Sequence, residues 1–368
     1  MAKQHAFRTD TQGLESLFAL LSDQGYAQMG PVVRDGAIML GEINSFDELA
    51  QGYTDEQAKG HYRIKPIPTR GLFQYAVGPQ SFKQYLHPPR RKLWSTHGSQ
   101  EKFTIEEGNE PEKMVFWGVR SCDLEAIKIL DRIFLEGAFV NKWYQQAREQ
   151  LVIIAASCPV PSANCFCTST NTGPKPESDF DIAIHEIMDH DCCYYILETG
   201  SHKGEKLIQK LRIQKVSEEE LDSLERMIEK AASSMEKRFE PAEAADLLKK
   251  TLEHKHWDEV GSRCLSCANC TMVCPTCFCT STEDITEITG EHSERWLRWD
   301  SCFNGDFSYI HGGKIRDSTR SRYRQWMTHK LSYWYEQFGT SGCVGCGRCI
   351  TWCPVGIDII EELEALAR

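Results

Sequence analysis

The sequence has no long apolar run, and nothing in it approaches the roughly 18 consecutive apolar residues that a membrane-spanning helix needs. Its first residues, MAKQHAFRTDTQG, also lack the apolar core of a signal peptide. Positive charge is in short supply, because 42 Lys and Arg residues stand against 53 Asp and Glu residues and the formal net charge is -11. We therefore expect a cytoplasmic protein with no transmembrane segment and no general affinity for nucleic acids or anionic membranes.

The motifs of several enzyme and regulator classes are missing as well. No G-x-G-x-x-G string follows a predicted strand, so we expect no flavin or nicotinamide site on this chain. The 12 histidines are scattered, and no grouping of Ser, His and Asp points to hydrolysis. No motif or basic face supports a DNA-binding regulator. We therefore assign no catalytic residue to this chain.

What the sequence has in excess is cysteine, with 17 residues. In a reducing cytoplasm these are expected to be thiols, and thiols that cluster along a cytoplasmic chain usually bind metal. Eleven of the 17 lie in residues 259–368. The metal chemistry is therefore expected mainly in the last third of the chain.

Eight of these cysteines form the string C-x2-C-x2-C-x3-C-P twice. The first copy is Cys264, Cys267, Cys270 and Cys274 with Pro275, and the second is Cys343, Cys346, Cys349 and Cys353 with Pro354. In two-cluster bacterial ferredoxins the first three cysteines of a string bind one [4Fe–4S] cluster and the fourth binds the other. We therefore assign Cys264, Cys267, Cys270 and Cys353 to cluster 1, and Cys343, Cys346, Cys349 and Cys274 to cluster 2. Structural zinc would account for C-x2-C pairs, but not for two complete strings.

Four further cysteines are predicted to meet at one edge of a sheet. Cys122 follows the predicted strand MVFWGV (114–119) and opens a helix, and Cys158 follows the predicted strand LVIIAAS (151–157). In a parallel sheet both would lie at the carboxyl edge, where α/β folds place ligands, and Cys165 and Cys167 follow on the same loop. We predict that Cys122, Cys158, Cys165 and Cys167 hold a third [4Fe–4S] cluster. A zinc ion and a set of buried thiols without metal stay open as alternatives.

The remaining cysteines support weaker predictions. Cys192 and Cys193 are neighbours in a predicted strand and face opposite sides, so we interpret them as inert thiols. Cys277, Cys279 and Cys302 either tune the adjacent cluster through hydrogen bonds or ligate something together, and the first interpretation is favoured. One short string, CFCTST, occurs at 165–170 and again at 277–282.

The pattern of apolar residues predicts an α+β chain in three parts. Residues 1–205 mix predicted strands with the helix LEAIKILDRIFLEG (124–137) and form an N-terminal α/β domain. Residues 206–258 are rich in Glu, Lys and Leu at helical spacing and form a helical arm, with Ser217 as an N-cap and Pro241 opening a second helix. Residues 259–368 form an α-helical di-cluster ferredoxin domain, in which helices fill the space between the two cysteine strings.

Basic residues gather in two places. Arg316, Arg320, Arg322 and Arg324 lie between the cysteine strings, where they either raise a cluster potential or pair with local carboxylates. Arg90, Arg91 and Lys92 form either a solvated loop or a docking surface for an acidic partner.

The chain resembles a known family in five strings. They are FWGVRSCDLEAIKILDRIF, NCFCTSTNTGP, CLSCANCTMVCPTCFC, RWDSCF followed by HGGKIRDSTRSRYRQW, and GCVGCGRCITWCPVGIDI. The family is the iron–sulfur β subunit of cytoplasmic sulfhydrogenases, which are NAD(P)-linked [NiFe] hydrogenases, and the A subunit of anaerobic sulfite reductase is similar. The resemblance runs from about residue 60 to the last residue.

The resemblance implies an electron-transfer subunit of a multi-subunit oxidoreductase. Such a subunit passes single electrons through [4Fe–4S] clusters between a flavin subunit, which handles NAD(P)H, and a catalytic subunit. The catalytic partner is a [NiFe] hydrogenase in one case and a sirohaem sulfite reductase in the other. The family's ligands carry over onto the eight motif cysteines. A stand-alone iron–sulfur enzyme with an open iron site in the N-terminal domain is kept as an alternative.

Overall fold

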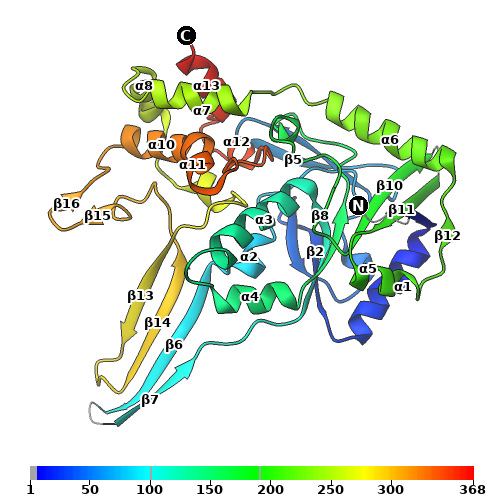
Figure 1. The fold of residues 1–368 in the computed structure, drawn as a ribbon, viewed down its shortest axis with the longest axis horizontal. Coiled ribbons are helices and arrows are strands. Elements are labelled where there is room, and N and C mark those ends of the chain that lie inside the picture. The colour runs from blue at the N-terminus through cyan, green and yellow to red at the C-terminus, as the bar shows by residue number, and fades with distance from the viewer. Residues whose placement is uncertain (1–5, 100–101, 190–191) are drawn as a thin grey trace.

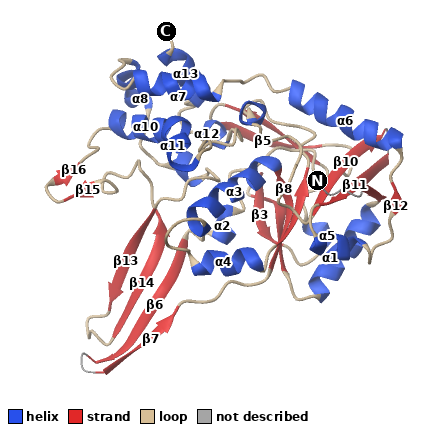
Figure 2. Ribbon diagram, viewed as in Figure 1, coloured by secondary structure: helices blue, strands red, loops and turns tan. Residues whose placement is uncertain are grey.

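The computed structural model describes residues 6–99, 102–189 and 192–368. It contains both helices and sheets, as predicted for an α+β chain (Figure 2). Among the described residues, no helix is long and apolar enough to span a bilayer.

An eight-stranded mixed sheet forms the centre of the first half of the chain. Its order is β12-β1-β11-β10-β9-β8-β2-β3, and the pairs β2/β8, β8/β9 and β9/β10 are parallel. The strands are β1 (Ala6–Thr9), β2 (Ala27–Arg34), β3 (Ala37–Glu42), β8 (Met114–Arg120), β9 (Val152–Ala156), β10 (Ile182–Asp189), β11 (Cys192–Thr199) and β12 (Gln214–Lys215). The predicted strands over 114–119 and 151–157 are therefore confirmed.

Helices cover this sheet on both faces, because the buried strands are apolar on both sides. Adjacent residues of a strand point to opposite faces, so Trp117 packs in the core with Leu14 and Phe116 packs in the core with Leu130. The covering helices are α1 (Thr11–Asp23), α2 (Lys83–Leu86), α3 (Ser121–Leu135), α4 (Lys142–Glu149) and α5 (His202–Ile208). Helix α3 confirms the helix predicted over 124–137.

A second sheet joins strands from distant parts of the sequence. Its order is β13-β14-β6-β7, with β6 (Arg90–Ser99), β7 (Lys102–Glu107), β13 (Thr280–Thr286) and β14 (His292–Trp299). Figure 1 shows it extending away from the rest of the molecule. The prediction that helices fill the space between the cysteine strings is wrong in this stretch, because β13 and β14 pair with each other and with β6. The domain boundaries at 205 and 258 stay predictions.

The rest of the chain is mainly helical. Ser217 caps α6 through a full capping box with Glu220, and Pro241 is the first residue of α7, as the sequence predicts. Helix α10 continues through a π-helical turn, His329–Tyr333, into α11. The helices are α6 (Glu218–Ser233), α7 (Pro241–Lys250), α8 (His256–Arg263), α9 (Asn269–Met272), α10 (Thr319–Thr328), α11 (Trp334–Phe338), α12 (Arg348–Thr351) and α13 (Ile359–Leu366).

Two small two-stranded sheets complete the fold. Strand β4 (Tyr53–Ala58) pairs with β5 (His61–Pro66), and β15 (Tyr309–Ile310) pairs with β16 (Gly313–Lys314).

Candidate metal centres

The two cysteine strings form loops with the same backbone conformation. Ser266 and Ala268 in the first loop have φ values of 51° and 65°, and the equivalent Gly345 and Gly347 in the second loop have values of 61° and 71°. This conformation aims backbone N–H groups at sulfur. The N–H of Ser266 donates to Cys264 Sγ at 3.4 Å, and the N–H of Gly345 donates to the Sγ of Cys343 at 3.5 Å. Such bonds favour the thiolate, which is the form that binds iron.

The first site is a cavity lined by Cys264, Cys267, Cys270 and Cys353, the four cysteines that the crossed pattern groups together. Its inner wall is aromatic. Its outer wall is open, because Cys267 is exposed and the neighbouring Leu265 and Val355 have 62% and 41% of their surface in solvent. The first site therefore lies at the surface of the protein.

The second site brings together Cys343, Cys346, Cys349 and Cys274. Burial is the main cause that raises the pKa of Cys343 to about 12, and the nearby Cys346 and Cys274 add to it while Lys330 opposes it. Burial is also the main cause that raises the pKa of Cys349, and the nearby thiols of Cys343, Cys346 and Cys274 raise it further. Cys349 also lines the cavity of the first site. The first and second sites are thus immediate neighbours.

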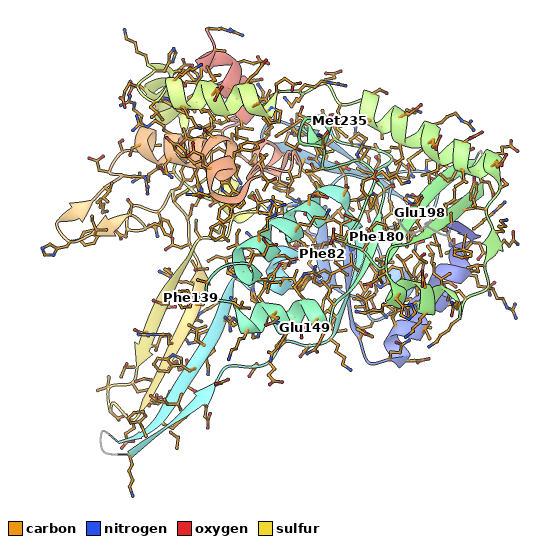
Figure 3. All side chains as sticks on the ribbon, viewed as in Figure 1. Phe82, Phe139, Glu149, Phe180, Glu198 and Met235 are labelled. Atoms are coloured by element: carbon orange, nitrogen blue, oxygen red, sulfur yellow. The ribbon has the colours of Figure 1, made fainter. Side chains whose placement is uncertain are left out.

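The third site is a cavity lined by Cys122, Cys158, Cys165 and Cys167. Cys122 lies in the first turn of α3, directly after β8, and Cys158 follows β9, so two parallel strands deliver both thiols to one edge of the sheet. The predicted meeting of these four cysteines is therefore found. Met235 closes the cavity, with its Sδ 3.7 Å from the Sγ of Cys167, and Figure 3 shows Met235 between α6 and α7.

The second and third sites share a wall. Cys346, from the second set, also lines the cavity of the third set. The loop of the third site packs directly on the second cysteine loop, where the N–H of Phe166 donates to the carbonyl of Gly345 at 2.8 Å. The hydroxyl of Thr172 donates to the carbonyl of Val344 at 2.8 Å. A Cβ on Gly345 would lie 2.5 Å from the backbone of Cys167, so only glycine fits this approach.

A buried ion pair lies between the same two sites. Arg348, in the second cysteine loop, places its Nη2 atom 2.8 Å from Oδ2 of Asp123, which follows Cys122 on α3. Although burial opposes it, the negative charge of Asp123 and the thiols of Cys346 and Cys122 raise the pKa of Arg348. The guanidinium is therefore a fixed positive charge beside both thiol sets.

Two buried lysines lie beside the second site, and no sequence pattern indicated them. Lys330 is 5% exposed, and its Nζ lies 3.2 Å from the Sγ of Cys274 and 2.9 Å from the carbonyl of Gly342. Lys83 is 3% exposed and donates to the carbonyls of Cys274 and Cys277 at 2.9 Å. Hydrogen bonding from Cys277, helped by Lys330 and opposed by burial, holds the pKa of Cys274 well below its usual value. The chain thus stabilises an anion at Cys274.

The other predicted groups have varied surroundings. Cys193 is half-buried with its Sγ 3.5 Å from Glu186, and the side chain of Cys192 lies outside the described residues. Arg320 and Arg324 pair with Glu253, whereas Arg322 donates to Ser266 beside the first site. Arg90, Arg91 and Lys92 belong to β6 instead of a loop, and each lies over a tryptophan ring.

The donor sets fit iron–sulfur clusters. Among residues 6–99, 102–189 and 192–368, no three His, Cys, Asp or Glu side chains gather tightly around a point that suits a single metal ion. The four thiolates of a [4Fe–4S] cluster each bind a different iron atom, so they lie farther apart than the ligands of one ion. Sets of four thiols with N–H and Lys donors match that requirement in composition.

Comparison with known proteins adds two findings. Residues 263–357 match the family described as a 4Fe-4S dicluster domain. The chain is 30% identical over 338 residues, which are 91% of this chain and 90% of the relative, to sulfhydrogenase 2 subunit beta of Pyrococcus furiosus. No solved structure matches the chain significantly.

Proposed function

Because this chain belongs to the family of sulfhydrogenase beta subunits, we propose that it is the electron-transfer subunit of a multi-subunit oxidoreductase with three [4Fe–4S] clusters. The observation that carries the proposal is the continuity of the three thiol sets. Cys349 belongs to the second set and lines the first cavity, and Cys346 belongs to the second set and lines the third cavity. The three sets therefore form one unbroken series through the protein.

In this proposal each set holds one cluster. Cluster 1 takes Cys264, Cys267, Cys270 and Cys353; cluster 2 takes Cys343, Cys346, Cys349 and Cys274; cluster 3 takes Cys122, Cys158, Cys165 and Cys167. Such clusters exchange single electrons. The surrounding residues set how readily they do so, because positive charge and N–H donors favour the reduced, more negative state.

The side chains around the three sites have distinct roles in this proposal. Lys330 and Arg348 place positive charge at the second and third sites, where burial makes it effective. Met235 excludes water from the third site. The exposed rim at Leu265 and Cys267 leaves the first site open, so this is where the chain would exchange electrons with a partner.

We propose a flavin subunit that handles NAD(P)H and a [NiFe] hydrogenase as the partners in a cytoplasmic complex, because the relative is named a sulfhydrogenase subunit. Purification of the tagged chain from its native cells tests this. A [NiFe] hydrogenase and a flavoprotein should co-purify. A sirohaem protein would instead assign the chain to an anaerobic sulfite reductase, and turnover by the chain alone would overturn the relay function.

The third cluster is tested by iron analysis of anaerobically prepared protein. Three clusters require at least about twelve iron atoms per chain, whereas the dicluster domain alone requires about eight. The Cys158→Ser variant should lose about four irons, and the Cys193→Ser variant should lose none because that thiol lies outside every set. A wild-type count near eight would rule out the third cluster while leaving the dicluster function intact.

A further inference from the structure

The repeated string CFCTST has a structural counterpart. In the first copy, Cys165 and Cys167 line the cavity of the third site. In the second copy, Cys277 and Cys279 line another cavity, and Cys302 lines it with them. Each copy thus adds two cysteines to a cavity that already has a thiol on its wall.

This second cavity, the Cys302 cavity, has room for a bound group. Its volume is about 140 Å3, which is several times the ~30 Å3 share of one water molecule in the liquid. Cys277, Cys279 and Cys302 all line this one cavity. The thiols and the space they enclose therefore lie together.

The charge around the Cys302 cavity suits an anion. Lys330 and Arg316 line it, and neither forms an ion pair with a carboxylate in the part of the chain that the structure describes. Lys330 already has an anionic partner in Cys274, so Arg316 is the cation on this wall that would need a counter-charge. A cluster bound by thiolates carries net negative charge and would provide one.

One buried hydrogen-bond donor on the cavity wall lacks a partner in the described residues. Trp326 is 4% exposed and lies between the Cys302 cavity and the first site, lining both, and within the described residues its Nε1 has no hydrogen-bond acceptor. Buried indole N–H groups normally have a partner. A sulfide or thiolate sulfur of a bound cluster would supply an acceptor.

Part of the cavity wall is an irregular helix. His329 and Lys330 belong to the π-helical turn His329–Tyr333, and both line the cavity. Single π turns inside helices occur frequently at functional sites. His329 thus offers an imidazole to the same space as the three thiols.

From these observations we propose that Cys277, Cys279 and Cys302 ligate a further [4Fe–4S] cluster, with His329 as the fourth ligand. The inference goes beyond the proposed function, which needs only the other three sets. It also reverses the interpretation favoured by the sequence, in which these cysteines only tune a neighbouring cluster. Lys83 donates to the carbonyls of both Cys274 and Cys277, and Lys330 both contacts Cys274 and lines the cavity, so the new site lies next to the second one.

The first test is iron analysis of the full chain purified anaerobically. The Cys279→Ser/Cys302→Ser double variant should contain about four irons fewer than the wild type, with one Mössbauer component missing. The Cys193→Ser variant is the matched control and should equal the wild type. An unchanged iron count in a folded double variant would overturn the proposal.

A second test needs no variant and covers the case in which the double variant fails to fold. Anomalous diffraction at the iron edge from crystals of the anaerobic wild type should show iron in the Cys302 cavity. Iron at the other sets with none beside Cys302 would reject this inference and leave the proposed function standing. No iron at the third set would reject the third cluster separately.

Discussion

Arg348 and Asp123 form a buried ion pair with 2.8 Å between Nη2 and Oδ2, and each residue is the direct neighbour of a cysteine in a different site. Asp123 follows Cys122 of the third site, and Arg348 precedes Cys349 of the second site. Only 2% of the Arg348 side chain is exposed. The pair therefore fixes the position of one thiol set relative to the other.

Breaking this pair should destabilise the protein. Arg348→Met leaves Asp123 charged and buried without a partner, and we expect a loss of about 3–5 kcal/mol in the free energy of unfolding. The double variant Arg348→Met/Asp123→Leu should recover much of the loss, because no uncompensated charge remains. Urea unfolding under anaerobic conditions measures both. The control is Arg295→Met, which breaks an exposed pair with Asp284 and should change stability little. Equal losses in the single and double variants would contradict the argument.

Lys330 should raise the reduction potential of the second cluster. Its ammonium group donates to Cys274 Sγ at 3.2 Å and favours the more negative reduced state. A charge-assisted hydrogen bond contributes ~1.5–3 kcal/mol, and ~1.4 kcal/mol corresponds to about 59 mV for one electron. Lys330→Met should therefore lower the midpoint potential by at most about 60–130 mV in an EPR-monitored titration. Lys128→Met, which removes a surface lysine on α3, should leave the potential unchanged.

Arg322 should act on the first cluster in the same direction. Its Nη2 lies 3.4 Å from the hydroxyl of Ser266, and its charge opposes the burial that raises the pKa of Cys264. Arg322→Glu should lower the midpoint potential of cluster 1. Arg320→Glu is the control, because Arg320 pairs with Glu253 and Asp258 instead. A potential that moves equally in both variants would show a general charge effect and no local role.

Gly345 should be essential for stability, whereas Ser266, at the equivalent position of the first loop, should be replaceable. Gly345→Ala adds a Cβ 2.5 Å from the backbone of Cys167 at a φ of +61°. We expect a loss of about 2–4 kcal/mol, from overpacking and from the left-handed conformation together. Ser266→Gly relieves the left-handed conformation at the equivalent position of the first loop but also removes the hydroxyl that contacts Arg322 and Thr319, so it should change stability by no more than about 1 kcal/mol. Chemical unfolding under anaerobic conditions measures both changes, and a stable Gly345→Ala variant would contradict the close packing.

Iron should leave the first site before the others. Cys267 and Leu265 are exposed there, while Cys343 at the second site and Cys122, Cys165 and Cys167 at the third are buried. Under mild oxidation with a chelator, alkylation followed by mass spectrometry should label Cys267 first and Cys343 later. Earlier labelling of Cys343 would show that access through the Leu265 rim does not control iron loss.

Much of the site was predictable because it depends on local patterns. The strands before Cys122 and Cys158 are continuous apolar runs, as buried parallel strands usually are, so their carboxyl edge could be located without a structure. The crossed grouping of Cys274 and Cys353 was predicted from the spacing of the two strings, and Cys353 does line the first cavity with Cys264, Cys267 and Cys270.

Other features depend on partners far away in the sequence. Strands β13 and β14 read TSTEDIT and HSERWLRW, which have few apolar residues, and β14 is stabilised by pairing with β6. Lys83 and Lys330 meet at Cys274 from distant helices, so no local spacing indicated them. The joint position of Cys279 and Cys302 likewise depends on the turn that follows β14.

The pairing of β6 with β14 also determines when this protein can finish folding during synthesis. His97 and His292 face each other in that sheet although 195 residues separate them. At ~5–20 residues per second, a ribosome needs roughly 10–40 s to make the intervening chain. During that interval the hairpin of β6 and β7 has an open edge along β6, and open edges invite pairing with other chains. Efficient production should therefore depend on chaperones that shield this hairpin until β14 has emerged.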